Sequence, residues 1–242
     1  REALRITREV NKKDSTYWER SRPIPLTDEE TIDYLKKETL AAKRESKPYL
    51  DSLDSKSNIF KPMRFLLGSG YTHSNRFKKE YFRLSSLLWS TFYNTVEGFG
   101  LNYGANYVKQ IDSLSNKWVR YSANVRYGFA NQLINAHIRG SLPVGNGIFS
   151  FALGSDVQDL NRRGSVTPLQ NSINSLLEER NDLKLYHNAF AQLGLSGRIF
   201  GNVRTSASLE FASRRSLVNA SAYRINDFDN RTFSSNNPLN PS

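Results

Sequence analysis

The chain of 242 residues contains no cysteine and no long apolar run. Without cysteine there is no disulfide bond and no thiolate metal ligand. No stretch approaches the ~18 consecutive apolar residues that mark a membrane-spanning helix. These absences exclude a disulfide-stapled domain, a cysteine metal site and a helical membrane protein.

Residues with the chemistry of a catalytic centre are also scarce. The three histidines, His73, His137 and His187, stand singly, without the H-x-x-x-H spacing or the nearby acid that a metal site uses. The sequence has no G-x-S-x-G motif, no P-loop and no dinucleotide-binding fingerprint. We therefore predict a protein that is not an enzyme and that holds no cofactor and no metal.

The charge of the chain is strongly positive, at +11 from 34 basic and 23 acidic residues. An excess of this size is typical of nucleic-acid-binding proteins when the cations gather in one patch. Here they are spread along predicted strands and turns, so we predict no nucleic-acid partner.

The clearest pattern is an alternation of apolar and polar residues over 118–154. A period of two predicts strands with one apolar and one polar face. The apolar positions are odd before the turn at Asn131 and even after it, which is what a hairpin produces when it keeps one face apolar. Similar alternation at 99–107 and 193–211, with weaker signals near 64–73 and 80–88, predicts about eight antiparallel strands.

The lengths of three loops predict three strand registers. These are two-residue loops at 131–132 and 145–146 and a three-residue loop at 200–202. The predicted cross-strand pairs are, in the same order, Val125 with Ile138, Gly140 with Phe151, and Leu193 with Leu209.

Strand length then separates two fold classes. Strands in soluble proteins run about five or six residues, whereas membrane-crossing β-strands run about nine to eleven. The alternating segments are of the longer kind, which favours an all-β fold, an antiparallel transmembrane β-barrel built as a meander. The alternative that stays open is a soluble all-β binding module, whose apolar face packs on a second sheet.

In the barrel interpretation, the apolar face meets lipid and the polar face lines an aqueous interior. The predicted lipid-facing residues are Tyr103, Tyr121, Val125, Tyr127, Ile138, Phe151 and Leu209. The predicted lumen-facing residues are Arg120, Asn124, Arg126, Arg139, Arg204 and Glu210. Glu97 and Glu210 fall on the polar face, where we expect salt bridges with cations such as Arg126 or Arg204.

Two segments favour helices. Thr27 and Glu30 have the spacing of a capping box, and Pro48 follows, so we predict an N-terminal helix at about 28–46. A second helix is predicted over 167–182, between two strands.

Several motifs together resemble a known family. They are Trp18 followed by RPIPLTDEE (22–30), ESKPYLDSLD (45–54), YNTVEGFGLNYG (93–104), VRYGFAN (125–131) and SNNPLNP (235–241). They are similar to uncharacterised outer-membrane proteins of Bacteroidota that are called carboxypeptidase-like regulatory domain-containing proteins. That name refers to the fold of an N-terminal sandwich domain and not to peptidase activity.

The resemblance implies a location and an organisation. Residues 1–62 are expected to be a periplasmic linker, and residues 63–242 the first part of a barrel in the cell outer membrane that continues beyond Ser242. The implied partners are outer-membrane lipid, and lipopolysaccharide or other envelope proteins. The implied role is transport, assembly or surface organisation.

The resemblance also suggests a modification site. Exported proteins of this bacterial group carry O-glycans at Asp followed by Ser or Thr and then a small apolar residue or Thr. Residues 14–16, 51–53 and 112–114 fit this pattern. Ser113 is the preferred candidate because it lies in a predicted turn between two strands.

Overall fold

The structure is a computed structural model that describes residues 15–21, 25–113, 116–161, 166–199 and 203–237. The chain divides into two compact units, Arg1–Tyr49 and Leu50–Ser242. The first unit contains helices α1 (Ser15–Ser21) and α2 (Asp28–Glu45).

Helix α2 begins and ends where the sequence predicts. The backbone N–H of Glu30 donates to Thr27 Oγ1 at 3.3 Å, and the N–H of Thr27 donates to Glu30 Oε2 at 2.9 Å, which completes the capping box. Ser46, two residues before Pro48, is extended and ends the helix. A further helix that was not predicted, α3 (Lys47–Ser57), follows at once, with Pro48 in its first turn, where proline is tolerated.

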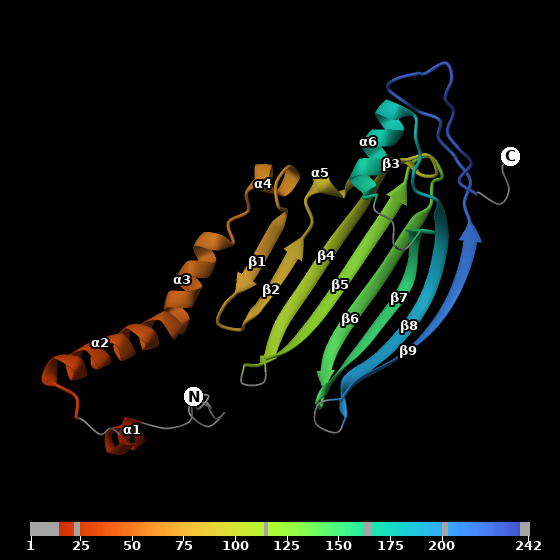
Figure 1. The fold of residues 1–242 in the computed structure, drawn as a ribbon. Helices are drawn as coiled ribbons and strands as arrows, with labels where there is room; N and C mark the ends of the chain where they lie inside the picture. The colour runs from red at the N-terminus through yellow and green to blue at the C-terminus, as the bar shows by residue number, and fades with distance from the viewer. Residues whose placement is uncertain (1–14, 22–24, 114–115, 162–165, 200–202, 238–242) are drawn as a thin grey trace, which may run out of the picture. The chain divides into compact units, whose positions relative to one another are not determined.

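The second unit is dominated by one nine-stranded antiparallel sheet (Figure 1). Its strands are β1 (Tyr71–Asn75), β2 (Glu80–Leu84), β3 (Thr91–Asn94), β4 (Gly98–Asp112), β5 (Lys117–Gly128), β6 (Ile134–Val144), β7 (Gly147–Asp159), β8 (Leu185–Ile199) and β9 (Val203–Ser216). The strand order is β1-β2-β4-β5-β6-β7-β8-β9, and the short β3 also pairs with β4. The remaining helices are α4 (Pro62–Leu66), α5 (Leu87–Ser90) and α6 (Pro168–Glu178).

The prediction of an antiparallel all-β fold is confirmed, but a closed barrel is not what the described residues form. Strands β1 and β9 lie at the two ends of the strand order, so the sheet is open. All 14 residues of β9 are exposed, as suits an edge strand.

The weak strand signals near 64–73 and 80–88 were only partly right. Helix α4 occupies the start of the first segment, and β1 begins only at Tyr71. Gly70, with φ +82°, makes the turn before β1, where an added Cβ would lie 2.1 Å from the carbonyl oxygen of Leu84. The second segment ends as a strand at Leu84, and α5 follows it. Strand β3 was missed, which is why the sheet has nine strands instead of about eight.

Two of the three predicted registers are confirmed. Gly140 lies opposite Phe151, and Leu193 lies opposite Leu209. The aromatic ring covers the glycine, since a Cβ on Gly140 would lie 2.3 Å from Phe151 Cε1. The loop at 200–202 itself lies outside the described residues.

The predicted register of β5 and β6 was wrong by two residues. Val125 lies opposite Ala136, and not opposite Ile138. The loop spans 129–133 because the N–H groups of Phe129 and Ala130 donate to the carbonyl oxygens of Phe99 and Glu97 instead of pairing within the hairpin. A shift of two residues leaves each side chain on its predicted face.

The connections at the two ends of the long strands differ in length (Figure 1). One end, here the short-turn rim, carries tight turns such as the one at Gly145-Asn146 between β6 and β7. The other end, the long-loop rim, carries α4, the α5–β3 insertion, α6 and the segment 217–237.

The glycine of β7 provides a test of this fold. Gly154 has φ +134°, and a Cβ there would lie 2.1 Å from the carbonyl oxygen of Ala136. We predict that Gly154→Ala lowers the free energy of unfolding by about 1–3 kcal/mol, because backbone atoms cannot yield as a side chain can. Urea unfolding measures the change.

The matched control is Gly145→Asn in the β6–β7 turn. Gly145 has φ +56° with nothing within 4 Å of an added Cβ, and asparagine tolerates this left-handed conformation. We expect a change within about 0.5 kcal/mol. Equal losses in the two variants would contradict the strain assigned to Gly154.

Candidate functional site

The register gives the sheet one continuous apolar face. One row of cross-strand neighbours runs from Tyr107 in β4 through β5, β6, β7 and β8 to β9, in the order Tyr107, Tyr121, Gly140, Phe151, Leu193 and Leu209. All seven residues predicted to face lipid share this face. Val125, Ile138 and Leu209 on it are 52%, 48% and 56% exposed. What covers the face stays a prediction.

The opposite face is polar and holds all six residues predicted to face an interior. Arg139 neighbours Ser122 and Ala152, and the same row continues through Gln192 to Glu210. Arg120, Asn124, Arg126 and Arg204 lie in other rows of this face.

A buried turn, residues 93–97, joins β3 to β4 at the long-loop rim. Its five side chains are between 1% and 4% exposed, although three of them are Asn94, Thr95 and Glu97. Asn94 Oδ1 closes the turn by accepting the N–H groups of Val96 and Glu97 at 3.0 and 2.8 Å. Gly98 follows with φ +66°, a conformation that glycine adopts without strain.

The buried turn is fixed to the sheet by an ion pair. Arg126 Nε and Nη2 donate to Glu97 Oε1 and Oε2 at 2.8 and 2.5 Å, with side-chain exposures of 12% and 1%. Asn94 Nδ2 donates to the same carboxylate at 2.8 Å, and the guanidinium lies 4.3 Å from the ring centroid of Phe92. The predicted pairing of Glu97 with Arg126 is therefore confirmed.

The second predicted acid has a different partner. Glu210 pairs with Arg214 at 3.2 Å along the same strand, and not with Arg204. Arg204 lies opposite Arg198, whereas Glu210 lies opposite Gln192. The two side chains are therefore too far apart along β9 to form an ion pair.

Helix α6 covers the buried turn with its polar side. Thr167 Oγ1 caps it by accepting the N–H of Gln170 at 3.2 Å, and Glu179, with φ +56°, ends it earlier than the predicted residue 182. Ser172 Oγ accepts the N–H of Tyr93 at 2.8 Å and donates to its carbonyl oxygen at 3.0 Å. The apolar residues Leu169, Ile173 and Leu177 are instead exposed.

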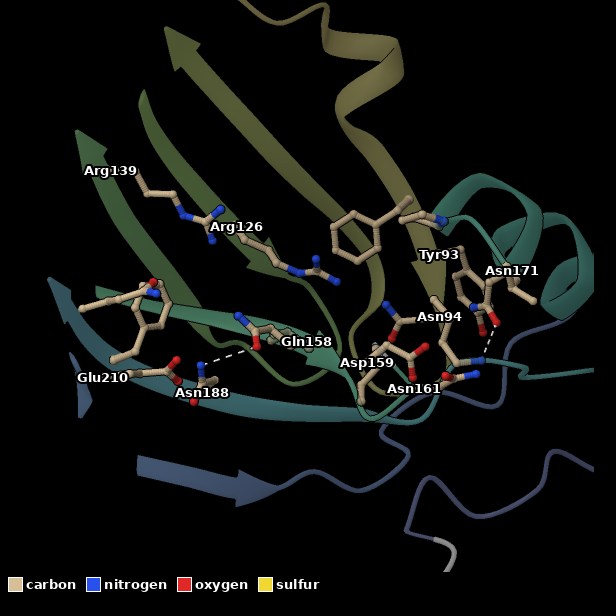
Figure 2. A pocket seen from close by; sticks show the side chains of 18 residues that line it. Tyr93, Asn94, Arg126, Arg139, Gln158, Asp159, Asn161, Asn171, Asn188 and Glu210 are labelled. Carbon is tan, nitrogen blue, oxygen red and sulfur yellow. Dashed lines mark hydrogen bonds between the residues drawn. The ribbon is translucent and has the colours of Figure 1, made fainter. Parts of the chain in front are cut away.

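A pocket of about 580 Å³ opens on the polar face beside the start of α6 (Figure 2). Phe92 and Asn94 line it from the buried turn and its strand, Asn171 from α6, and Arg139 and Asn188 from the sheet. Its volume falls in the range of small-molecule sites. We take this pocket as the candidate functional site; sequence reasoning placed Arg126, Arg139 and Glu210 on its face but did not find the pocket.

Two buried amides in the pocket have unused hydrogen-bonding atoms. Asn171 Oδ1 accepts the N–H groups of Asp182 and Leu183 at 2.9 and 3.0 Å. Within the described residues, Asn171 Nδ2 and Asn188 Oδ1 have no partner, although these side chains are only 1% and 2% exposed. Buried polar atoms of this kind are expected to meet ordered water or a ligand.

The loop after α6 sets the charge beside the pocket. A hydrogen bond from Asn174 Nδ2 at 2.7 Å, helped by Arg180, lowers the pKa of Asp182. Burial lowers the pKa of Lys184, whose Nζ donates to Ser234 Oγ at 2.6 Å. The loop is thereby joined to the segment that follows β9.

The remaining predicted residues lie apart from the pocket. Ser113 lies beside the β4–β5 turn, exposed, and accepts a hydrogen bond from Lys79 Nζ at 2.6 Å. Across the part of the chain that the structure describes, no three metal-ligating side chains come together. Within the same residues, no helix has the length and apolar character needed to span a membrane.

Comparison with known proteins places most of this unit in one family. Residues 63–242 match the model described as the C-terminal domain of a family of unknown function, DUF5686. No curated protein and no solved structure matches the chain.

The ion pair of the buried turn provides a second test. We predict that Glu97→Gln lowers the free energy of unfolding by about 3–5 kcal/mol, because Arg126 stays buried without a countercharge. Urea unfolding measures this loss, and Glu97→Gln combined with Arg126→Met should recover part of it.

The control is Glu210→Gln on the same face. Its pair with Arg214 is exposed, with side-chain exposures of 37% and 52%. Such pairs contribute about 0–1 kcal/mol. A loss at Glu97 no larger than the loss at Glu210 would refute the anchoring role of the buried pair.

Proposed function

The chain belongs to the DUF5686 C-terminal-domain family, whose function is unknown, and on its geometry we propose that it forms part of the wall of an outer-membrane β-barrel. The apolar face meets lipid, and the polar face lines a water-filled interior. The role is transport of a solute past the pocket, and the chain is not an enzyme.

One observation carries this proposal, namely the continuous exposed apolar face. It extends over β4 to β9, strands of 11 to 15 residues each, which is enough to cross a bilayer at the usual tilt. Soluble monomers rarely expose contiguous apolar patches larger than a few hundred Å². Lipid chains would remove such a face from water without a protein partner.

The polar face favours transport over the two other roles considered for a barrel wall, which are assembly and surface organisation. Arg139 and Gln192 are exposed at the pocket, so a solute in a wet interior reaches them directly. The rival function, a soluble binding module, needs a second layer over the apolar face. The nine described strands form a single sheet, so that layer would have to come from outside these strands.

The proposal includes an orientation. The chain enters the sheet through α4 at the long-loop rim, so a periplasmic linker places this rim in the periplasm. Bacterial barrels usually keep their short turns there, which makes this orientation a specific claim. Lipopolysaccharide, in the outer leaflet, then meets the short-turn side of the sheet.

The lipid contact is tested at two adjacent residues of β5. We predict that Val125→Arg lowers the stability of the folded protein in lipid vesicles by about 2–4 kcal/mol, because the charge enters the bilayer. Asn124→Arg, on the polar face, should change it by about 0.5 kcal/mol or less. Heat-modifiable gel migration and urea titration measure both variants. A wild-type chain that stays folded and monodisperse without detergent or lipid would refute the membrane placement.

The orientation is tested with single cysteines, for which the chain has no background. We expect a membrane-impermeant maleimide to label Asn146→Cys, in the β6–β7 turn, on intact Gram-negative cells. Thr232→Cys, beyond β9, should react only after the outer membrane is permeabilised. The reverse pattern would contradict the orientation, and no labelling of either variant on intact cells would contradict the crossing itself.

A further inference from the structure

Two arginines near the middle of the polar face, Arg120 in β5 and Arg139 in β6, have no acidic partner. Among the described residues neither forms an ion pair, whereas Arg126 and Arg214 on the same face are each bound by a glutamate. The parts of the second unit outside the described ranges contain no aspartate or glutamate side chain. Both arginines are exposed, so a solute on this face meets their positive charges.

The two arginines form one diagonal of a square with two serines. Arg120 lies directly opposite Ser141, and Ser122 lies directly opposite Arg139. Diagonal neighbours in such a ladder have Cβ atoms roughly 7 Å apart, within reach of long side chains. We call these four residues the arginine–serine square.

The surroundings of the square suit an anion. Asn106 and Ser150 lie directly opposite its two serines. The nearest acid in these two rows, Glu210, lies three strands beyond Arg139, roughly 14 Å away. A guanidinium group presents a fork of N–H donors that matches a carboxylate or a phosphate, and hydroxyl and amide groups add further donors.

Arg139 also joins the square to the pocket beside α6 (Figure 2). It lines the pocket, and its Cζ lies 5.9 Å from the ring centroid of Phe190. A cation–π contact holds a guanidinium group in place without neutralising its charge. A solute that reaches the pocket from the polar face therefore meets a positive charge.

From these observations we propose that the arginine–serine square binds anionic solutes through a carboxylate or phosphate group. Arginine and lysine side chains select anions in the same way where they line membrane pores. The inference rests on the proposed function, since it names the class of solute that the polar face passes. Binding itself needs only the folded chain.

The test titrates the full chain with citrate and with inorganic phosphate at low ionic strength, and calorimetry measures binding. The medium is a zwitterionic detergent, or buffer alone if the chain stays folded there. We expect at least one of the two anions to bind, high salt to weaken it, and glucose and choline not to bind. Binding of neither anion, or equal binding of choline, overturns the proposal.

Substitutions at Ser141 locate the anion. Ser141→Glu places a carboxylate directly opposite Arg120 and two residues from Arg139, so it supplies the missing countercharge and should abolish binding. Ser141→Gln has the same size without the charge and should keep the Kd within about twofold of the wild-type value. Equal binding by the two variants would overturn the proposal.

The arginines are tested one at a time. Arg120→Gln and Arg139→Gln should each raise the Kd about fivefold, because each removes charge-assisted hydrogen bonds. Arg215→Gln removes the same charge from an exposed position on the opposite face and should leave the Kd unchanged. Unchanged binding in folded Arg120→Gln and Arg139→Gln would place the anion elsewhere.

Failure of this inference and failure of the proposed function give different results. Anion binding by a chain in which Val125→Arg and Asn124→Arg are equally stable in vesicles would refute the membrane placement alone. A chain that shows the expected difference between those two variants, but binds neither anion, would refute the anion site alone.

Discussion

The buried ion pair between Glu97 and Arg126 is the contact on which the rest of the second unit depends. A carboxylate that is 1% exposed has lost its hydration, and the bidentate arginine and Asn94 replace it. The pair fixes the buried turn against β5. The buried turn also holds the segment that follows β9, because the carbonyl oxygen of Thr95 accepts the N–H groups of Ala220 and Ser221 at 2.8 and 2.9 Å.

The buried apolar side chains also gather around the buried turn. The small buried cluster of Val96, Val157 and Leu185 lies where the buried turn meets the ends of β7 and β8, with Leu183 and Leu217 packed against it. Many large apolar side chains of the long strands, by contrast, stay exposed. Among the described residues, the long-loop rim therefore contains a small buried core like that of a globular protein. The sheet beyond this rim is a single layer. Hydrogen-bonded strand pairs and the medium on each face must stabilise that layer.

Sequence reasoning succeeded where local rules decide the outcome. Alternation fixed the faces, and tight loops fixed the pairs of Gly140 with Phe151 and of Leu193 with Leu209. The β5–β6 register failed because the N–H of Ala130 finds its acceptor in Glu97, a residue far away in the sequence. The buried turn was missed because its side chains are mostly polar, so hydrophobicity could not reveal their burial. The sequence feature that could have predicted the turn is Asn94 followed by Gly98. The asparagine side chain accepts backbone N–H groups of the turn, and the glycine adopts the positive φ that follows it.

Helix α6 shows why the pocket could not be read from periodicity. An amphipathic pattern normally predicts that the apolar stripe packs inward. Here Ser172 and Asn171 face inward, since the backbone of Tyr93 and the loop at 182–183 need hydrogen-bonding partners that leucine cannot supply. Satisfying those groups leaves Leu169 and Ile173 exposed and places Asn171 in the wall of the pocket. The polar wall of the pocket is thus a consequence of how the buried turn is covered, because the helix that covers the turn also supplies Asn171 to that wall.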